Sequence, residues 1–198
     1  MPGKDLRLVV GLGNPGSDYA ATRHNAGFLV VDALAQAWSI PIHRKKFNAE
    51  LGRGRIKGID TLLMKPLSYM NRSGAPVKQV GDYFRISYRE MLVIHDDIDL
   101  EFGRIKIKEK GGHGGHNGVR SIIDTLGEDT FARLRLGIGR SGEDGTVTNH
   151  VLGQFGRQEK TALEKVVARA RDAVETILCE GTREGMNRFN DRSIHFLS

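Results

Sequence analysis

The chain has 198 residues, which is enough for a single domain, residues 1–198, with a hydrophobic core of its own. Its one cysteine, Cys179, excludes an internal disulfide, and no run approaches the ~20 apolar residues of a membrane-spanning helix. The net charge of +6 suits a polyanionic partner such as nucleic acid but does not identify one. We therefore expect a soluble, cytoplasmic protein in a reducing compartment.

Strands and helices are predicted to alternate along the chain. Short apolar or alternating runs predict strands over 6–12, 49–56, 60–66, 91–96, 103–109 and 131–139. Apolar stripes at helical spacing predict helices over 28–38, 117–127 and 157–180, with Asn117 as an N-cap and with Gly127 and Gly181 as closing glycines. This order indicates an α/β fold: a single domain with a twisted mixed β-sheet packed between α-helices.

The first strand, LRLVV, runs directly into GLGNPGSDYAATRHNAG. There Gly11, Gly13 and Gly16 match the G-x-G-x-x-G of dinucleotide-binding loops. That fingerprint also needs a helix that opens within the motif and an acid at the end of a second strand about twenty residues later. Here the residues after Gly16 are polar, and the acid at the right distance, Asp32, lies inside a predicted helix. The sequence therefore disfavours a nucleotide site.

Polar residues within and after this loop are better candidates for chemistry. Asn14 follows the first strand, at the edge where α/β sheets place their ligands. His24 lies just before the helix over 28–38, whose positive N-terminus disfavours imidazolium. We therefore treat His24 as a candidate general base, with a structural or surface histidine as the alternative.

Two further segments follow predicted strands. KPLSYMNRSG places Met70 and Asn71 at the entry to another helix, where Asn71 is alternatively an N-cap. HDDIDL follows the apolar strand MLVI, so Asp96 should reach the same edge of the sheet as Asn14. A buried aspartate bonded to His24 would fix the tautomer of the imidazole and support the charge that it gains.

A third segment, KEKGGHGGHNG, combines glycines with polar side chains. Its glycines allow backbone to approach a ligand closely, while His113, His116 and Asn117 supply donors and acceptors. Strand alternation puts the flanking cations on common faces, as expected for a phosphate-contacting surface or for a merely solvated basic strand. These cations are Lys106, Lys108, Lys110, Arg133 and Arg135.

The identity of the nucleophile is approached by exclusion. The H-x-x-H at 113 and 116 lies in a glycine loop without a nearby cysteine, so metal binding is a minor alternative. No G-x-S-x-G nucleophile elbow is present, and Cys179 lies among apolar residues of the long helix, where we expect it to belong to the core rather than to act as a nucleophile. Water is the remaining candidate nucleophile.

Taken together, these motifs resemble one family. GLGNPG, TRHNAG, KPLSYMNRSG, HDDIDL, GGHGGHNG and FARLRLGIG occur in the order found in bacterial-type peptidyl-tRNA hydrolase, from residue 6 to about 190. The chain departs from the family in reading RSGEDG after GIG, where a proline-containing turn is usual, and in carrying His150 in place of an aromatic residue. Both changes fall in a loop beside the substrate surface, so they bear on fine contacts.

The resemblance implies an enzyme that cleaves the ester between a peptide and tRNA, and so rescues tRNA from aborted translation. It implies that His24 activates water, that Asp96 orients His24, and that Asn14 assists catalysis. The further residues that it implies are Tyr19, Met70, Asn71, His116 and Asn117 for substrate binding and Lys108 and Arg135 for the tRNA phosphate. It also implies a monomer without metal or other cofactor that binds the acceptor stem and CCA end.

Two rival functions remain open from the sequence. One is a binding module that keeps the basic surface but performs no catalysis, and the other is a nucleotide-dependent oxidoreductase. The sequence does not determine the preference among tRNAs and peptide lengths, or the roles of the basic C-terminal region and of loop 140–150.

Overall fold

The computed structural model describes residues 6–140 and 146–190, apart from the side chains of residues 157 and 158, and is built on a seven-stranded mixed sheet. The strands are β1 (Arg7–Gly11), β2 (Arg44–Lys46), β3 (Ala49–Ile56), β4 (Ile59–Pro66), β5 (Met91–Asp97), β6 (Ile105–Lys108) and β7 (Ala132–Gly137). They lie in the order β2-β3-β4-β1-β5-β7-β6. The strands β4, β1, β5 and β7 are parallel, so their carboxyl ends meet at one edge of the sheet.

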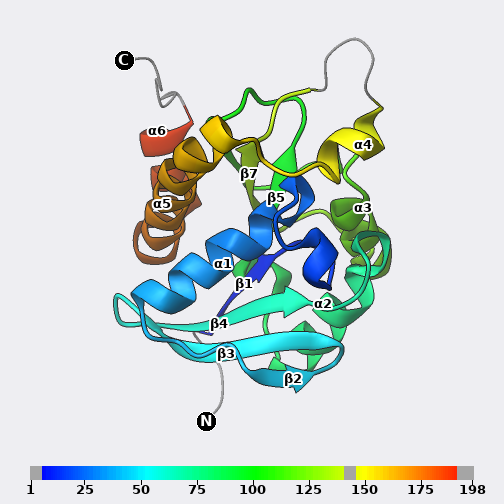
Figure 1. Cartoon of the computed structure of the whole chain (residues 1–198). Helices are drawn as coiled ribbons and strands as arrows, with labels where there is room; N and C mark the ends of the chain where they lie inside the picture. Colours follow the sequence, from blue (N-terminus) through cyan, green and yellow to red (C-terminus); the bar gives the residue numbers. More distant parts are fainter. Residues whose placement is uncertain (1–5, 141–145, 191–198) are drawn as a thin grey trace.

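Helices cover both faces of this sheet (Figure 1). They are α1 (Ala26–Ala37), α2 (Gly74–Phe84), α3 (Asn117–Leu126), α4 (Val147–Val151), α5 (Arg157–Glu180) and α6 (Thr182–Phe189). The structure also contains short 3-10 turns: η1 (Ser17–Tyr19), η2 (Arg23–Asn25), η3 (Met70–Arg72) and η4 (Tyr88–Glu90). Among the described residues, no helix is both long enough and apolar enough to cross a membrane.

Side-chain alternation along the strands divides the core into two clusters. Val9 and Leu92 belong to the cluster under α1, α5 and α6, whereas their neighbours Val10 and Val93 belong to the cluster under α2 and α3. Successive side chains point to opposite faces of a sheet, so strands that are covered on both faces are apolar throughout. This accounts for the unbroken apolar runs of β1 and β5, and the α/β prediction is confirmed.

The six predicted strands are present, with ends shifted by a few residues, and α5 ends at Gly181 as predicted. The expectation that Cys179 belongs to the core is wrong, because this residue is exposed in the last turn of α5. The sequence did not indicate β2, α4 or α6. β2 consists of three cations, and its extended state comes from pairing with β3 rather than from an apolar pattern. α4 has only five residues, too few to show a helical stripe.

One expectation about helix ends is wrong, and one alternative is excluded. The N-cap of α3 is His116 rather than Asn117, because the imidazole Nδ1 of His116 accepts the N–H groups of Gly118 and Val119. Asn71 is not an N-cap either: it lies within η3, and α2 begins only at Gly74. Neither asparagine side chain therefore caps a helix.

Candidate active site

A cavity of about 790 Å³ opens where the parallel strands end. Its walls come from Asn14, His24, residues 69–72, residues 96–98, residues 113–117 and one side of α4. Asn14 follows β1, η3 follows β4, and Asp96 lies at the end of β5. The sequence predicted that these segments converge, because parallel strands end at the same edge of the sheet. In the structure they do converge there.

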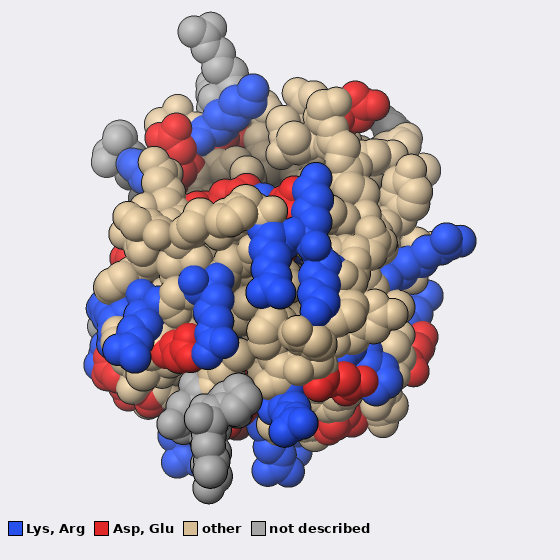
Figure 2. Space-filling view, turned by 90° about the horizontal axis from the view of Figure 1, so that it is seen from below, with Lys and Arg blue, Asp and Glu red and all other residues tan. Residues whose placement is uncertain are grey.

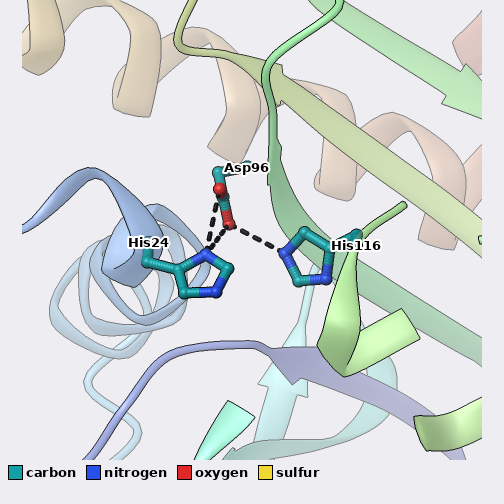
Figure 3. Close-up of side chains that lie close together, drawn as sticks. All are labelled: His24, Asp96 and His116. Carbon is teal, nitrogen blue, oxygen red and sulfur yellow. Dashed lines mark hydrogen bonds and ion pairs between the residues drawn. The ribbon is translucent and has the colours of Figure 1, made fainter. Parts of the chain in front are cut away.

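At the centre of the cavity wall, one carboxylate joins two imidazoles (Figure 3). The Nδ1 atom of His24 lies 2.9 Å from Oδ1 and 3.0 Å from Oδ2 of Asp96. The Nε2 atom of His116 lies 2.9 Å from the same Oδ1. The Asp96 side chain is 2% exposed and that of His24 is 10% exposed, so water competes little for these hydrogen bonds.

The hydrogen bonds determine which nitrogen carries the proton in each ring. An ionised carboxylate only accepts, so His24 donates its Nδ1–H to Asp96 and keeps an unshared pair on Nε2. In Figure 3 this second nitrogen lies on the side of the ring away from the carboxylate. His116 accepts backbone N–H groups at Nδ1 and therefore donates from Nε2. A neutral His24 is thus presented in the tautomer that a general base needs.

The charge on Asp96 is maintained by its partners. Burial raises the pKa of this carboxyl group, but the interactions with His116 and His24 and their hydrogen bonds lower it by more. The net result is a pKa well below the ordinary range of an aspartate. Asp96 therefore stays ionised at every pH at which an imidazole can act as a base.

The same three residues, His24, Asp96 and His116, form the one group in the described part of the chain whose ligand atoms could hold a metal ion. These atoms lie within 4.8 Å of one another. A metal on Nε2 of His116 would have to displace its proton, although Nδ1 already accepts two backbone N–H groups. The ring would then have to become an imidazolate. The donor set fits a hydrogen-bonded triad better than a metal centre.

Glycines bring His24 to Asp96 by letting β1, β5 and the start of α1 touch. A Cβ atom on Gly11 would lie 2.3 Å from the carbonyl oxygen of Gly27, and one on Gly27 would lie 2.4 Å from that of Ile94. Side-chain carbon cannot occupy such positions. The glycines of the opening loop therefore serve close packing of the helix that follows His24, which is the reason they resemble a nucleotide-binding pattern.

Both the side chain and the backbone of Asn14 are held by hydrogen bonds. Its Oδ1 accepts the backbone N–H of Met70 at 2.7 Å, which fixes the orientation of the amide and leaves Nδ2 to donate. The side chain of Asn25 bonds both the N–H and the C=O of residue 14, at 2.9 and 3.0 Å. Asn25 is 2% exposed, and the sequence analysis missed its role although it adjoins His24. Because only the fold brings Asn25 to the backbone of Asn14, no local sequence pattern indicated this contact.

The remaining predicted substrate residues differ in position. Met70 is buried in the cavity wall, whereas the side chains of Asn71 and Asn117 are exposed at it. Tyr19 lies in η1, half-buried, and is not among the residues that line the cavity. Residues 141–145, where the sequence departs from the family pattern, lie outside the described residues.

The helix α4, which the sequence did not indicate, supplies an apolar wall to the cavity. Val147 and Leu152 line it and are 56% and 38% exposed. His150 fixes α4 to the end of β7, because its Nε2 lies 3.1 Å from the carbonyl oxygen of Ile138. His150, the second departure from the family pattern, is thus a structural contact rather than a cavity residue.

Beside the cavity, β6 and β7 carry cations on one face. Lys106 lies opposite Arg135 in the antiparallel pair, so like charges are neighbours. Arg135 forms an ion pair with Asp97, whereas Lys108 has no ion pair within the described chain. The positive charge of Arg135 lowers the pKa of Lys108, with smaller contributions from burial and from other cations. The excess of positive charge on this face of β6 and β7 would favour the binding of an anion.

Positive charge also collects on residues that do not line the cavity. Figure 2 views the molecule from the end that carries β2 in Figure 1, and Lys and Arg side chains gather there. Arg44 and Lys45 of β2 are exposed. A charged edge strand also discourages pairing with another chain, so charge by itself does not locate the functional surface.

Comparisons of the sequence and of the structure with known proteins agree with one another. The family model described as peptidyl-tRNA hydrolase matches residues 8–196. Proteins named peptidyl-tRNA hydrolase from Clostridium novyi and a Synechococcus strain are 45% and 50% identical, over 92% and 93% of this chain and 97% and 83% of theirs. The crystal structure of peptidyl-tRNA hydrolase from Acinetobacter baumannii has a TM-score of 0.89 and 40% identity, covering 95% of this chain and 96% of that chain.

Proposed function

Because the chain belongs to the peptidyl-tRNA hydrolase family, we propose that it hydrolyses the ester between a peptide and the terminal ribose of tRNA, with His24 as general base. The observation that carries this proposal is the arrangement of His24 in the cavity wall. Its Nδ1–H is donated to the buried carboxylate of Asp96, and its Nε2 keeps a lone pair. Such a group takes a proton from water without any covalent intermediate.

The reaction balances with these groups alone. Nε2 of His24 accepts a proton from water while the water oxygen attacks the ester carbonyl carbon and forms a tetrahedral intermediate. The imidazolium is stabilised by Asp96, whose carboxylate lies 2.9 Å from Nδ1. When the C–O bond to the ribose breaks, the imidazolium returns its proton to the leaving 3′ oxygen. The products are a peptide acid and a tRNA with a free hydroxyl group, and the base is regenerated.

Amide groups supply the polar contacts to the reacting carbonyl group and the peptide. Asn14 is the best placed donor, since its Oδ1 is occupied by Met70 N–H and its Nδ2 is left over. Asn71 and Asn117 line the same cavity. One oxyanion donor contributes roughly 10²–10³-fold and a positioned base roughly 10²–10⁴-fold, which is adequate for an activated ester.

The same amides offer a route to sparing aminoacyl-tRNA. A peptidyl group presents an amide next to the ester, and neutral asparagines can pair with it. A free aminoacyl group carries an ammonium there and would leave the asparagines poorly paired. We expect N-acetylation of the aminoacyl group to raise kcat/KM.

The tRNA end of the substrate is assigned to the cations of β6 and β7. Lys108 and Arg135 would bind the phosphate at the end of the acceptor stem, with the CCA end leading into the cavity. Phosphate contacts give affinity without reading base sequence, which suits an enzyme that serves many tRNAs. We propose that the protein acts as a monomer in the cytoplasm.

The test is single-turnover hydrolysis of N-acetyl-aminoacyl-tRNA by the wild type and by His24→Ala. We expect His24→Ala to lose roughly 10²–10⁴-fold in rate. The matched control is His43→Ala, because His43 is an exposed histidine that does not line the cavity. Equal acyl release by the wild type and His24→Ala, with tRNA binding retained, would instead identify a binding module.

A further inference from the structure

Arg133 is a cation that the structure turns away from solvent. The sequence grouped it with the phosphate-contacting cations, but it is only 3% exposed. Its Nη1 donates to the carbonyl oxygen of Gly112 at 2.7 Å, and its Nη2 donates to that of Gly111. Its guanidinium also lies 5.4 Å from the ring centroid of Phe131. These partners commit Arg133 to the protein, so it is not free to bind a phosphate.

The glycine loop over 111–115, which accepts hydrogen bonds from Arg133, needs stabilising contacts from other parts of the chain. Gly111, Gly114 and Gly115 have positive φ angles of 126°, 58° and 83°, which side chains rarely tolerate. Glycines lose the most conformational freedom on folding, so such a loop orders only at a cost. Two bonds from one rigid guanidinium to consecutive carbonyl groups restrict the start of the loop that leads to His116.

His95 contacts the imidazole ring of His116 directly. The ring centroids of His95 and His116 are 4.7 Å apart at an interplanar angle of 61°. His95 is 3% exposed, and its Nδ1 lies 2.7 Å from the carbonyl oxygen of Asp96. Burial lowers its pKa well below the ordinary histidine value, and His116 and Arg133 lower it further while Asp96 opposes. His95 is therefore a neutral ring packed against His116.

We propose that Arg133 and His95 are positioning residues that fix His116, and through it the geometry of Asp96 and His24. The inference rests on the proposed hydrolysis of the peptidyl ester. Arg133 sets where the glycine loop delivers His116, and His95 sets the angle of its ring. His116 then donates to Oδ1 of Asp96, the same atom that accepts from His24. A displaced His116 would let the shared carboxylate rotate and would misalign the base.

The experiment compares Arg133→Lys with the wild type on two substrates: N-acetyl-aminoacyl-tRNA and an N-acetyl-aminoacyl ester of adenosine, which lacks the acceptor stem. Lysine keeps the charge but cannot hold two carbonyl groups in a fork. We expect kcat to fall about 10- to 100-fold on both substrates, as for a slight misplacement of a catalytic group, with the salt dependence of KM unchanged. A loss confined to tRNA and expressed in KM would make Arg133 a phosphate contact and overturn the proposal.

A double-mutant cycle separates positioning from general stability. In a His116→Ala background, Arg133→Lys should lose its effect on kcat, because the residue that it positions is gone. Independent, multiplicative losses in the cycle would refute the inference. The control is Arg53→Lys. Arg53 also makes two hydrogen bonds, to the carboxylate of Asp60, but it lies on β3, toward the opposite edge of the sheet from β7. If Arg133→Lys does not fold, Arg133→Gln carries the same test.

His95 is tested by a pair of substitutions that split its two contacts. His95→Phe keeps a ring against His116 but cannot donate to the Asp96 carbonyl, whereas His95→Asn can donate but has no ring. We expect His95→Asn to lose more in kcat, and the reverse order would overturn the role given to the ring. Loss of hydrolysis by His24→Ala together with wild-type kcat in every Arg133 and His95 variant would refute this inference alone. Equal hydrolysis by the wild type and His24→Ala would refute the proposed function itself.

Discussion

Replacing Asp96 by asparagine removes the negative charge from the side chain to which both His24 and His116 are hydrogen-bonded. His116 must keep donating from Nε2, because its Nδ1 is held as an acceptor by backbone N–H groups. The asparagine carbonyl oxygen therefore turns to His116 and its NH₂ group faces Nδ1 of His24. A donor there favours the His24 tautomer that is protonated at Nε2, which cannot accept a proton from water.

The magnitude follows from the charge that is lost. In the wild type the developing imidazolium has a carboxylate oxygen 2.9 Å from Nδ1. For charge centres about 4 Å apart and an effective dielectric constant of about 20, their attraction is about 4 kcal/mol. Because each 1.36 kcal/mol is tenfold in rate, we expect kcat to fall by about a thousandfold. The tautomer change adds to this loss and does not offset it.

The assay is single-turnover release of N-acetyl-amino acid from tRNA, followed by rapid quenching. KM should change little, since Asp96 is buried behind His24 and is 1% exposed. The control is Asp99→Asn, which neutralises an exposed aspartate that pairs with Arg140. An Asp96→Asn enzyme that keeps its rate within threefold of the wild type, with a native melting temperature, would refute the tautomer argument.

The same substitution changes how stability depends on pH. The pKa of Asp96 is lowered in the folded state, so its contribution to stability is present above the unfolded-state pKa and is lost as the pH falls. An unfolded aspartate titrates near pH 3.9, so the loss of this stabilisation begins at about pH 4 and continues as the pH falls further. We expect the free energy of unfolding of Asp96→Asn to decline less steeply with acid than that of the wild type. Parallel declines in urea titrations would contradict the low pKa.

Three further predictions test other parts of the site. Lys108→Ala and Arg135→Ala should each weaken tRNA binding and reduce the slope of log K against log salt by about 0.7–0.9, with unchanged hydrolysis of an adenosine ester. Equal losses on both substrates would end the phosphate assignment. Gly27→Ala should destabilise the protein by about 3 kcal/mol in urea unfolding, because its Cβ would lie 2.4 Å from the backbone oxygen of Ile94 and 2.4 Å from the backbone nitrogen of Leu12. Gly112→Ala, whose Cβ meets nothing within 4 Å, is the control, and similar values for the two would argue against the close-packing role. Asn25→Ala should lower kcat about tenfold and stability by about 1–3 kcal/mol, because it frees the backbone of residue 14. A normal kcat in the folded variant would show that the amide cluster does not need this support.

The sequence by itself determined the α/β fold and the edge of the sheet at which the chemistry collects. Apolar runs such as MLVI predicted buried strands, and polar residues directly after them, Asn14 and Asp96, were expected at one edge because parallel strands end together. These are local patterns, and local patterns are visible in one chain. The resemblance then added expected roles that spacing could not, such as the choice of Lys108 and Arg135 among the cations as the residues for the tRNA phosphate.

Only the tertiary structure decided which polar groups share a proton and which cations stay free. Lys108 and Arg133 are both basic residues on outward-alternating strand positions, yet one is exposed and the other is 3% exposed under a glycine loop. Likewise, nothing in GGHGGHNG indicates that His116 rather than Asn117 caps α3, or that its other nitrogen bonds Asp96. Such contacts join residues far apart in sequence, and a hydrogen bond depends on positions to within a few tenths of an ångström, which the packing of the whole domain fixes.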